Sequence, residues 1–131
     1  MKKDIEFHPV TGVKLAIARE KDADGWSAYL INNNLIELTT MLITSRAYGK
    51  MEGKEKKSSV LRHMIERLEP TSFARIEGID PDLFALTNEF WISYYIVDQI
   101  FDKKFIFVAG SIQENHMSYI PELDLHGIVH T

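Results

Sequence analysis

The chain has 131 residues and a mass of 15.1 kDa, with 45% hydrophobic and 26% charged residues, which predicts one globular domain spanning residues 1–131. This composition excludes a wholly disordered chain, a coiled coil and a fibrous repeat, and the lack of cysteine excludes a disulfide framework, a thiolate metal site and cysteine catalysis. The net charge of −4 disfavours nonspecific binding to nucleic acid or to anionic membranes.

Turn-forming residues interrupt the chain every 10–15 residues, and short apolar runs lie between them. This spacing is typical of an all-β sandwich or barrel. The turn signals lie at residues 9–12, 22–25, 32–34, 49–53, 69–70, 78–81, 102–104 and 110–115.

Three strands are predicted in the first third of the chain. Residues 13–19 and 26–31 both alternate in hydropathy, which indicates strands, the first with one buried face formed by Val13, Leu15 and Ile17. The Asp-Gly pair before the second run predicts a hairpin across residues 20–25. A third strand is expected from Ile36 onward, where β-branched residues are frequent.

Residues 58–69 are ambiguous. The apolar side chains of Leu61, Met64, Ile65 and Leu68 have helical spacing, and Ser58 is a suitable N-cap. The alternative is a strand ending before Pro70, which the surrounding strands favour because a sandwich needs an element there.

Residues 90–97 give the strongest strand signal, and both faces of that strand are apolar. We therefore expect it to be central, with Trp91 buried. It should pair with residues 105–109, which carry a buried Phe107, across a tight turn at residues 102–104.

A longer pattern covers most of residues 24–110. A strand ending in Asn32, a long strand over residues 36–48 and the segment Leu68-Glu69-Pro70-Thr71-Ser72-Phe73 resemble an immunoglobulin-like accessory β-sandwich. Four further segments resemble a group of small bacterial proteins of about 130 residues, often labelled as a phenylalanyl-tRNA synthetase subunit: residues 44–49, 61–63, 90–95 and 103–108. The resemblance implies a single-domain antiparallel immunoglobulin-like β-sandwich of about seven strands. It implies no functional residues, because the chain is too short for the adenylate site of a synthetase.

No catalytic, cofactor or metal residues are predicted. His126 and His130, with Asp124 or His116, would give a metal site on a helix, but residues four apart on a strand lie about 13 Å from each other. Arg62, His63 and Glu66 form at most an ordinary ion pair. The chain contains neither the G-x-S-x-G motif of a hydrolase nor a phosphate-binding P-loop.

Residues 46–57 form a basic segment predicted to be a hairpin tip. Residues 1–66 carry eleven Lys/Arg against nine Asp/Glu, and residues 67–131 carry four against ten. The basic segment thus complements acidic residues of the second half, particularly Glu77, Asp80, Asp82 and Glu89. Its candidate interaction residues are Arg46, Tyr48, Lys50, Lys54, Lys56 and Lys57. The plain alternative is a solvated tip whose lysines keep an edge strand from pairing.

The expected function is a non-enzymatic protein-interaction or subunit-association module, because aromatic residues concentrate between residues 91 and 107 and a central strand with two apolar faces needs cover on both. The partner is a second protein or another copy of the chain. The alternative is an RNA- or tRNA-associated accessory protein in which Tyr48 stacks on bases, and the third is a small-molecule enzyme. The N-terminal sequence Met-Lys-Lys-Asp has no apolar stretch behind it, which predicts a cytoplasmic location.

Overall fold

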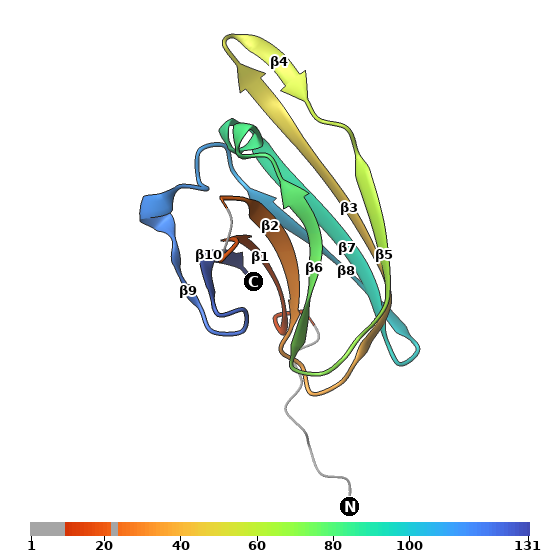
Figure 1. Ribbon diagram of the computed structural model, residues 1–131. Coiled ribbons are helices and arrows are strands. Elements are labelled where there is room, and N and C mark those ends of the chain that lie inside the picture. The colour runs from red at the N-terminus through yellow and green to blue at the C-terminus, as the bar shows by residue number, and fades with distance from the viewer. Residues whose placement is uncertain (1–9, 22–23) are drawn as a thin grey trace, which may run out of the picture.

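Ten strands form two antiparallel sheets that face each other in the computed structural model, which describes residues 10–21 and 24–131 (Figure 1). This confirms the predicted all-β sandwich, with ten strands in the described ranges where about seven were expected. The first sheet has the order β6-β2-β1-β10-β9, and the second has β4-β3-β7-β8 with β5 also paired to β3. The strands are β1 (Val13–Arg19), β2 (Trp26–Asn32), β3 (Leu38–Met51), β4 (Lys54–Lys57), β5 (Leu61–Leu68), β6 (Ser72–Ile79), β7 (Thr87–Ile96), β8 (Gln99–Phe107), β9 (Ser118–Ile120) and β10 (Leu125–His130), with short 3-10 helices η1 (Pro81–Ala85) and η2 (Glu114–His116). No helix in these ranges is long and apolar enough to cross a membrane.

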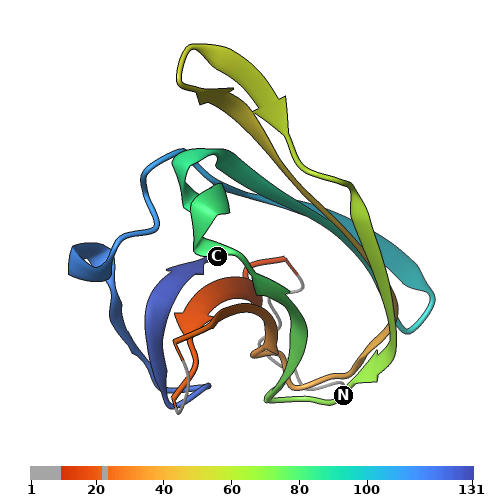
Figure 2. The ribbon, with the colours of Figure 1, turned by 45° about the horizontal axis from the view of Figure 1, so that its top comes forward.

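The first hairpin is confirmed, since β1 and β2 pair from Val13–Asn32 to Arg19–Trp26. The prediction of one buried face on β1 is wrong. One face packs between the sheets, and on the other face Ala16 and Ala18 are fully buried in a second cluster with Tyr29, Ile31, Ile120 and Leu123. The first sheet curls into an arch (Figure 2). The small side chains Ala16 and Ala18 lie on the face of β1 that points away from the second sheet.

A single long strand, β3, pairs with two successive strands along one edge. Its first part pairs with β5 and its last part with β4, while β7 pairs along the other edge. At the break between β4 and β5, the Ser58 N–H donates to the Ala47 carbonyl (2.8 Å) and the Ser58 hydroxyl accepts from the Ala47 N–H (2.8 Å). Residues 58–69 therefore contain a strand, and the helical spacing in that segment is coincidental. The β3–β4 hairpin extends beyond the rest of the sandwich (Figure 1).

Asn32 is fully buried and holds the turn between β5 and β6. Its side-chain nitrogen donates to the carbonyl oxygens of Ile36 (3.0 Å), Leu68 (3.3 Å) and Glu69 (3.0 Å), and its side-chain oxygen accepts from the Asn34 N–H (3.0 Å). Buried backbone groups need such partners. One side chain thus ties the end of β2 to the beginning of β3 and to the crossing between the sheets, which explains why the pattern couples an asparagine to the later Leu-Glu-Pro turn.

The second hairpin, β7–β8, is confirmed, and β7 is central as predicted, between β3 and β8. Two details were wrong. The turn lies at Val97 and Asp98, whereas residues 102–104 continue β8. Trp91 is 50% exposed, although Phe107 is fully buried as predicted. A central strand has neighbours on both edges, but this does not require that both of its faces be covered.

Candidate functional site

The outer face of the second sheet, which points away from the first sheet, carries exposed apolar side chains. Strand alternation buries Phe90, Ile92 and Tyr94 and turns their neighbours outward. Five apolar residues on this face are between 40% and 62% exposed, and Tyr95 is half-buried; the six are Leu42, Met64, Trp91, Tyr95, Ile100 and Ile106. We call this set, with the polar residues between its members, the outer face. Exposed apolar side chains gathered on one face of a sheet mark interaction surfaces in many proteins.

Trp91 lies in a row of side chains that crosses four strands. Arg62 on β5 is opposite Thr44 on β3, Thr44 is opposite Trp91 on β7, and Trp91 is opposite Lys104 on β8. Facing residues on neighbouring strands project from the same side of the sheet. The Lys104 ammonium is 4.7 Å from the centre of a Trp91 ring, within the range of a cation–π interaction. An aromatic ring between two cations is thereby held at the centre of the outer face.

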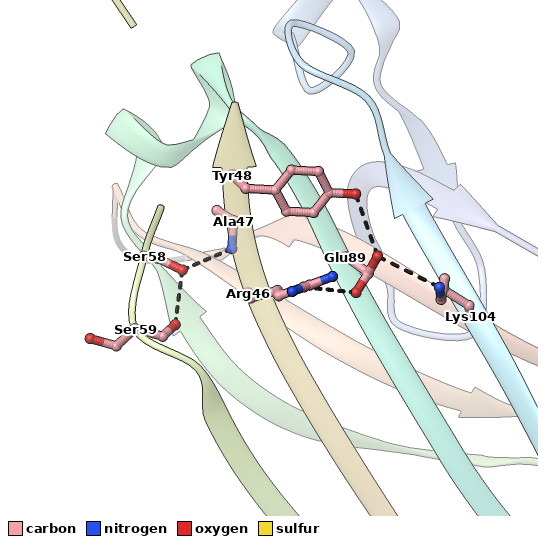
Figure 3. A network of polar contacts seen from close by, with 7 residues as sticks. All are labelled: Arg46, Ala47, Tyr48, Ser58, Ser59, Glu89 and Lys104. Atoms are coloured by element: carbon pink, nitrogen blue, oxygen red, sulfur yellow. Dashed lines mark hydrogen bonds and ion pairs between the residues drawn. The ribbon is translucent and has the colours of Figure 1, made fainter. Parts of the chain in front are cut away.

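Glu89 neutralises part of this charge. Its side chain is only 8% exposed, and it accepts a hydrogen bond from Arg46 Nε (3.0 Å) and one from the Tyr48 hydroxyl (3.4 Å), with Lys104 Nζ at 3.9 Å. Figure 3 shows these side chains converging from three strands. The Arg46 guanidinium also lies over the Tyr48 ring at 5.1 Å. Arg46 and Tyr48 are therefore held on the outer face.

The six predicted interaction residues do not form one surface. Arg46 and Tyr48 belong to the outer face, and the projecting β3–β4 hairpin carries the four lysines, of which Lys50 and Lys57 lie on the same side as Tyr48. Lys57 pairs directly with Tyr48. Lys54 and Lys56 pair with Met51 and Gly49, so they lie on the opposite side of the hairpin. The acidic residues expected to complement the hairpin are partly used within the chain, since Glu89 binds Arg46 and Glu77 binds His63.

A cavity of about 290 Å³ opens between the sheets where β5 and β6 separate. Its apolar wall is formed by Leu61, Ile79, Leu83 and Phe90, and its polar groups come mainly from Ser45, Ser58, Glu77 and Asn88. The Glu77 side chain is 13% exposed. Its carboxylate accepts from the Ser45 hydroxyl (2.9 and 3.0 Å to the two oxygens), and His63 Nε2 is 2.7 Å from Oε1.

This cluster was not predicted from the sequence. His63 does point away from Arg62 and Glu66, as expected for a strand, and its inward direction brings it to Glu77. A polar residue at an inward position of each of three strands is the signal that could have found the cluster. The carboxylate lies between the serine and the histidine, so the arrangement lacks the serine–histidine contact that activates a hydrolase nucleophile.

Three further histidines of the described residues, His116, His126 and His130, lie apart from both features. His126 contacts the ring of Tyr119, and His130 contacts the ring of Phe107, where burial lowers the pKa of His130. His116 Nδ1 is 3.0 Å from the Ser111 carbonyl oxygen. Within residues 10–21 and 24–131, no group of three or more His, Asp or Glu side chains gathers as a metal site would require. No protein-family model, curated protein or solved structure matches the chain.

Proposed function

We propose that the protein is a non-enzymatic interaction module that binds a second protein through the outer face. The observation that carries the proposal is the set of exposed apolar side chains around Trp91. Interfaces of this type commonly centre on an aromatic or arginine anchor with a polar border. Here Arg46, Arg62 and Lys104 border Trp91, so the complementary surface presents an apolar side chain flanked by carboxylates.

The aliphatic part of the outer face favours a protein over a nucleic acid. Leu42 and Met64 lie opposite each other on β3 and β5, and they are 52% and 62% exposed. Bases stack on aromatic and guanidinium planes and gain little from aliphatic side chains. Burying such side chains in a protein interface removes apolar surface from water, which favours association. We place the module in the cytoplasm and in the immunoglobulin-like class as parts of the same proposal; a chain without cysteine suits a reducing compartment.

The proposal is tested by affinity purification from the cytosol of the source organism with paired variants. The double variant Leu42→Ser/Trp91→Ser removes the centre of the outer face. Val108→Ser is the matched control, because Val108 is 59% exposed and lies beyond the end of β8. A protein recovered with the wild type and the control but lost with the double variant supports the proposal. Recovery of the same proteins with all three chains refutes it, provided that circular dichroism shows all three folded.

Single-stranded RNA is the second candidate, and the row Arg62–Thr44–Trp91–Lys104 is the observation that favours it. Trp26 is 8% exposed and Trp91 is 50% exposed, so quenching of tryptophan fluorescence reports mainly on Trp91. Titration with an oligouridine tests this function. Quenching that weakens as salt rises and disappears in Trp91→Leu favours RNA; unchanged fluorescence in low salt excludes stacking on Trp91.

A further inference from the structure

The carboxylate of Glu77 has more hydrogen-bonding capacity than its neighbours in the chain use. An ionised carboxylate offers about four acceptor positions. The Ser45 hydroxyl has one proton, so its two distances to the Glu77 oxygens describe one shared hydrogen bond, and His63 Nε2 supplies at most one more. About two acceptor positions are left on a side chain that is 13% exposed and lines the cavity.

Glu77 sets the charge of the cavity. Of the residues that line it, only Arg46 and Glu77 carry a full charge. The Arg46 guanidinium is turned to the outer face, where it binds Glu89 (Figure 3). It therefore leaves the Glu77 charge without a guanidinium partner inside the cavity. A carboxylate in a partly enclosed site favours a cationic ligand and disfavours an anionic one.

The rest of the wall defines the body of the ligand. Phe90 and Ile79 are buried at 2% and 7% exposure and, with Leu61 and Leu83, present carbon to the cavity. A volume of about 290 Å³ lies just below the range of drug-sized ligand sites, which is roughly 300–1,000 Å³. A compact apolar group of one ring or a short aliphatic chain fits this space.

We infer that the cavity between β5 and β6 is a binding site for a small organic ammonium ion with an apolar body. The ammonium donates to the free positions of the Glu77 carboxylate, and the body packs on Phe90, Ile79 and Leu83. Ser45 and His63 hold the carboxylate in place from β3 and β5. The site lies on the inner side of the second sheet, away from the outer face. The inference concerns binding alone, without any chemical change of the ligand.

Three probes of similar size test the inference: benzylamine, which is cationic, benzyl alcohol, which is neutral, and phenylacetate, which is anionic. Each is titrated at neutral pH while the backbone amide resonances of Ser45, Gly78 and Ile79 are followed by NMR. Benzylamine is expected to shift these resonances and to bind at least about tenfold more tightly than benzyl alcohol, as a charge-assisted hydrogen bond predicts. Phenylacetate is expected to leave them unchanged.

The variant Glu77→Gln keeps the shape of the side chain and removes its charge, so it should lose the preference for benzylamine. Asp82→Asn is the matched control, because Asp82 is an exposed carboxylate on the neighbouring helix η1 and does not line the cavity. The inference is overturned if the amine and the alcohol bind equally, if Glu77→Gln binds benzylamine as the wild type does, or if no probe shifts these resonances at millimolar concentration. Should Glu77→Gln fail to fold, the comparison of the three probes on the wild type decides.

Discussion

Gly127 on β10 lies where two strands come too close for any side chain, so Gly127→Ala is expected to be strongly destabilising. Gly127 pairs with Ala18 of β1 on one side and with Ser118 of β9 on the other. A Cβ atom added at Gly127 would lie 2.4 Å from the Ile17 carbonyl oxygen and 2.6 Å from the Ala18 Cα atom. Both of these are backbone atoms, which cannot rotate away as the end of a side chain can.

The size of the effect follows from the distance that the strands must move. An ordinary Cβ contact begins near 3.4 Å, so β1 and β10 must separate by about 1 Å at this point. A hydrogen bond of about 2.9 Å stretched by that amount is broken. The β1–β10 ladder joins only four residue pairs. Losing two of its hydrogen bonds in a buried region costs about 2–5 kcal/mol, a large part of a typical stability of about 5–15 kcal/mol.

Equilibrium unfolding in urea, followed by circular dichroism, measures this loss. Gly25→Ala is the matched control, because the nearest atom to its added Cβ is Glu20 Cγ at 4.0 Å. We expect a much lower urea midpoint for Gly127→Ala and a nearly unchanged one for Gly25→Ala. Equal midpoints would show that the added methyl group meets no fixed obstacle, which would contradict the close approach of β1 and β10 at Gly127.

Three further predictions concern the core, the tyrosines and the hairpin. In urea unfolding, Phe107→Ala should lower the free energy of unfolding by about 3–5 kcal/mol because it leaves a closed cavity. Trp91→Ala should lower it less because half of Trp91 already faces water. Equal losses would contradict the assigned faces of β7 and β8. Burial raises the pKa of Tyr29 and of Tyr94 to about 12, from an unfolded value near 10. The stability that these two neutral tyrosines contribute is therefore fully present below pH 10 and is lost as the pH rises toward 12. Urea midpoints and tyrosinate absorbance across that window check this, and a constant midpoint would refute it. Replacing Lys50, Lys54, Lys56 and Lys57 by serine should leave the melting temperature unchanged. Light scattering should increase, because β4 is an edge strand and its lysines keep it from pairing with other chains. Loss of a salt-sensitive association without aggregation would instead favour docking through these lysines.

The alternation of apolar residues was sufficient to place β1, β2, β3 and the β7–β8 hairpin, but it did not locate the turn of that hairpin. The run Asp102-Lys103-Lys104 looks like a turn, yet it is tolerated within β8 because β8 is an edge strand and two of the three side chains face water. Lys103 points inward and donates from Nζ to the Val10 and Val13 carbonyl oxygens. The real turn has Val97 at φ 56°, a conformation that β-branched residues rarely adopt, so no sequence rule points to it.

The cavity and the outer face could not be predicted from the sequence for a different reason. Ser45, His63 and Glu77 lie on three strands, and their meeting depends on the register of β3 with β5 and on the way that β6 crosses to the other sheet. The row that contains Trp91 depends in the same way on the registers of β5 with β3, β3 with β7 and β7 with β8. Each residue taken alone had an ordinary interpretation, and only the pairing of distant strands gives the group its geometry.

The separation of β5 from β6 has a consequence for how the sandwich opens. No backbone ladder joins these two strands; the His63–Glu77 contact spans the gap between them, and β5 is held on its other edge by β3 alone. Amide hydrogens of β5 that point toward β6 lack a ladder acceptor there, so they should exchange with solvent far faster than those of β1 or β7, which have strands on both edges. A local fluctuation between β5 and β6 therefore moves the two sheets apart at this edge and exposes the interior, while the hydrogen bonds within each sheet stay intact.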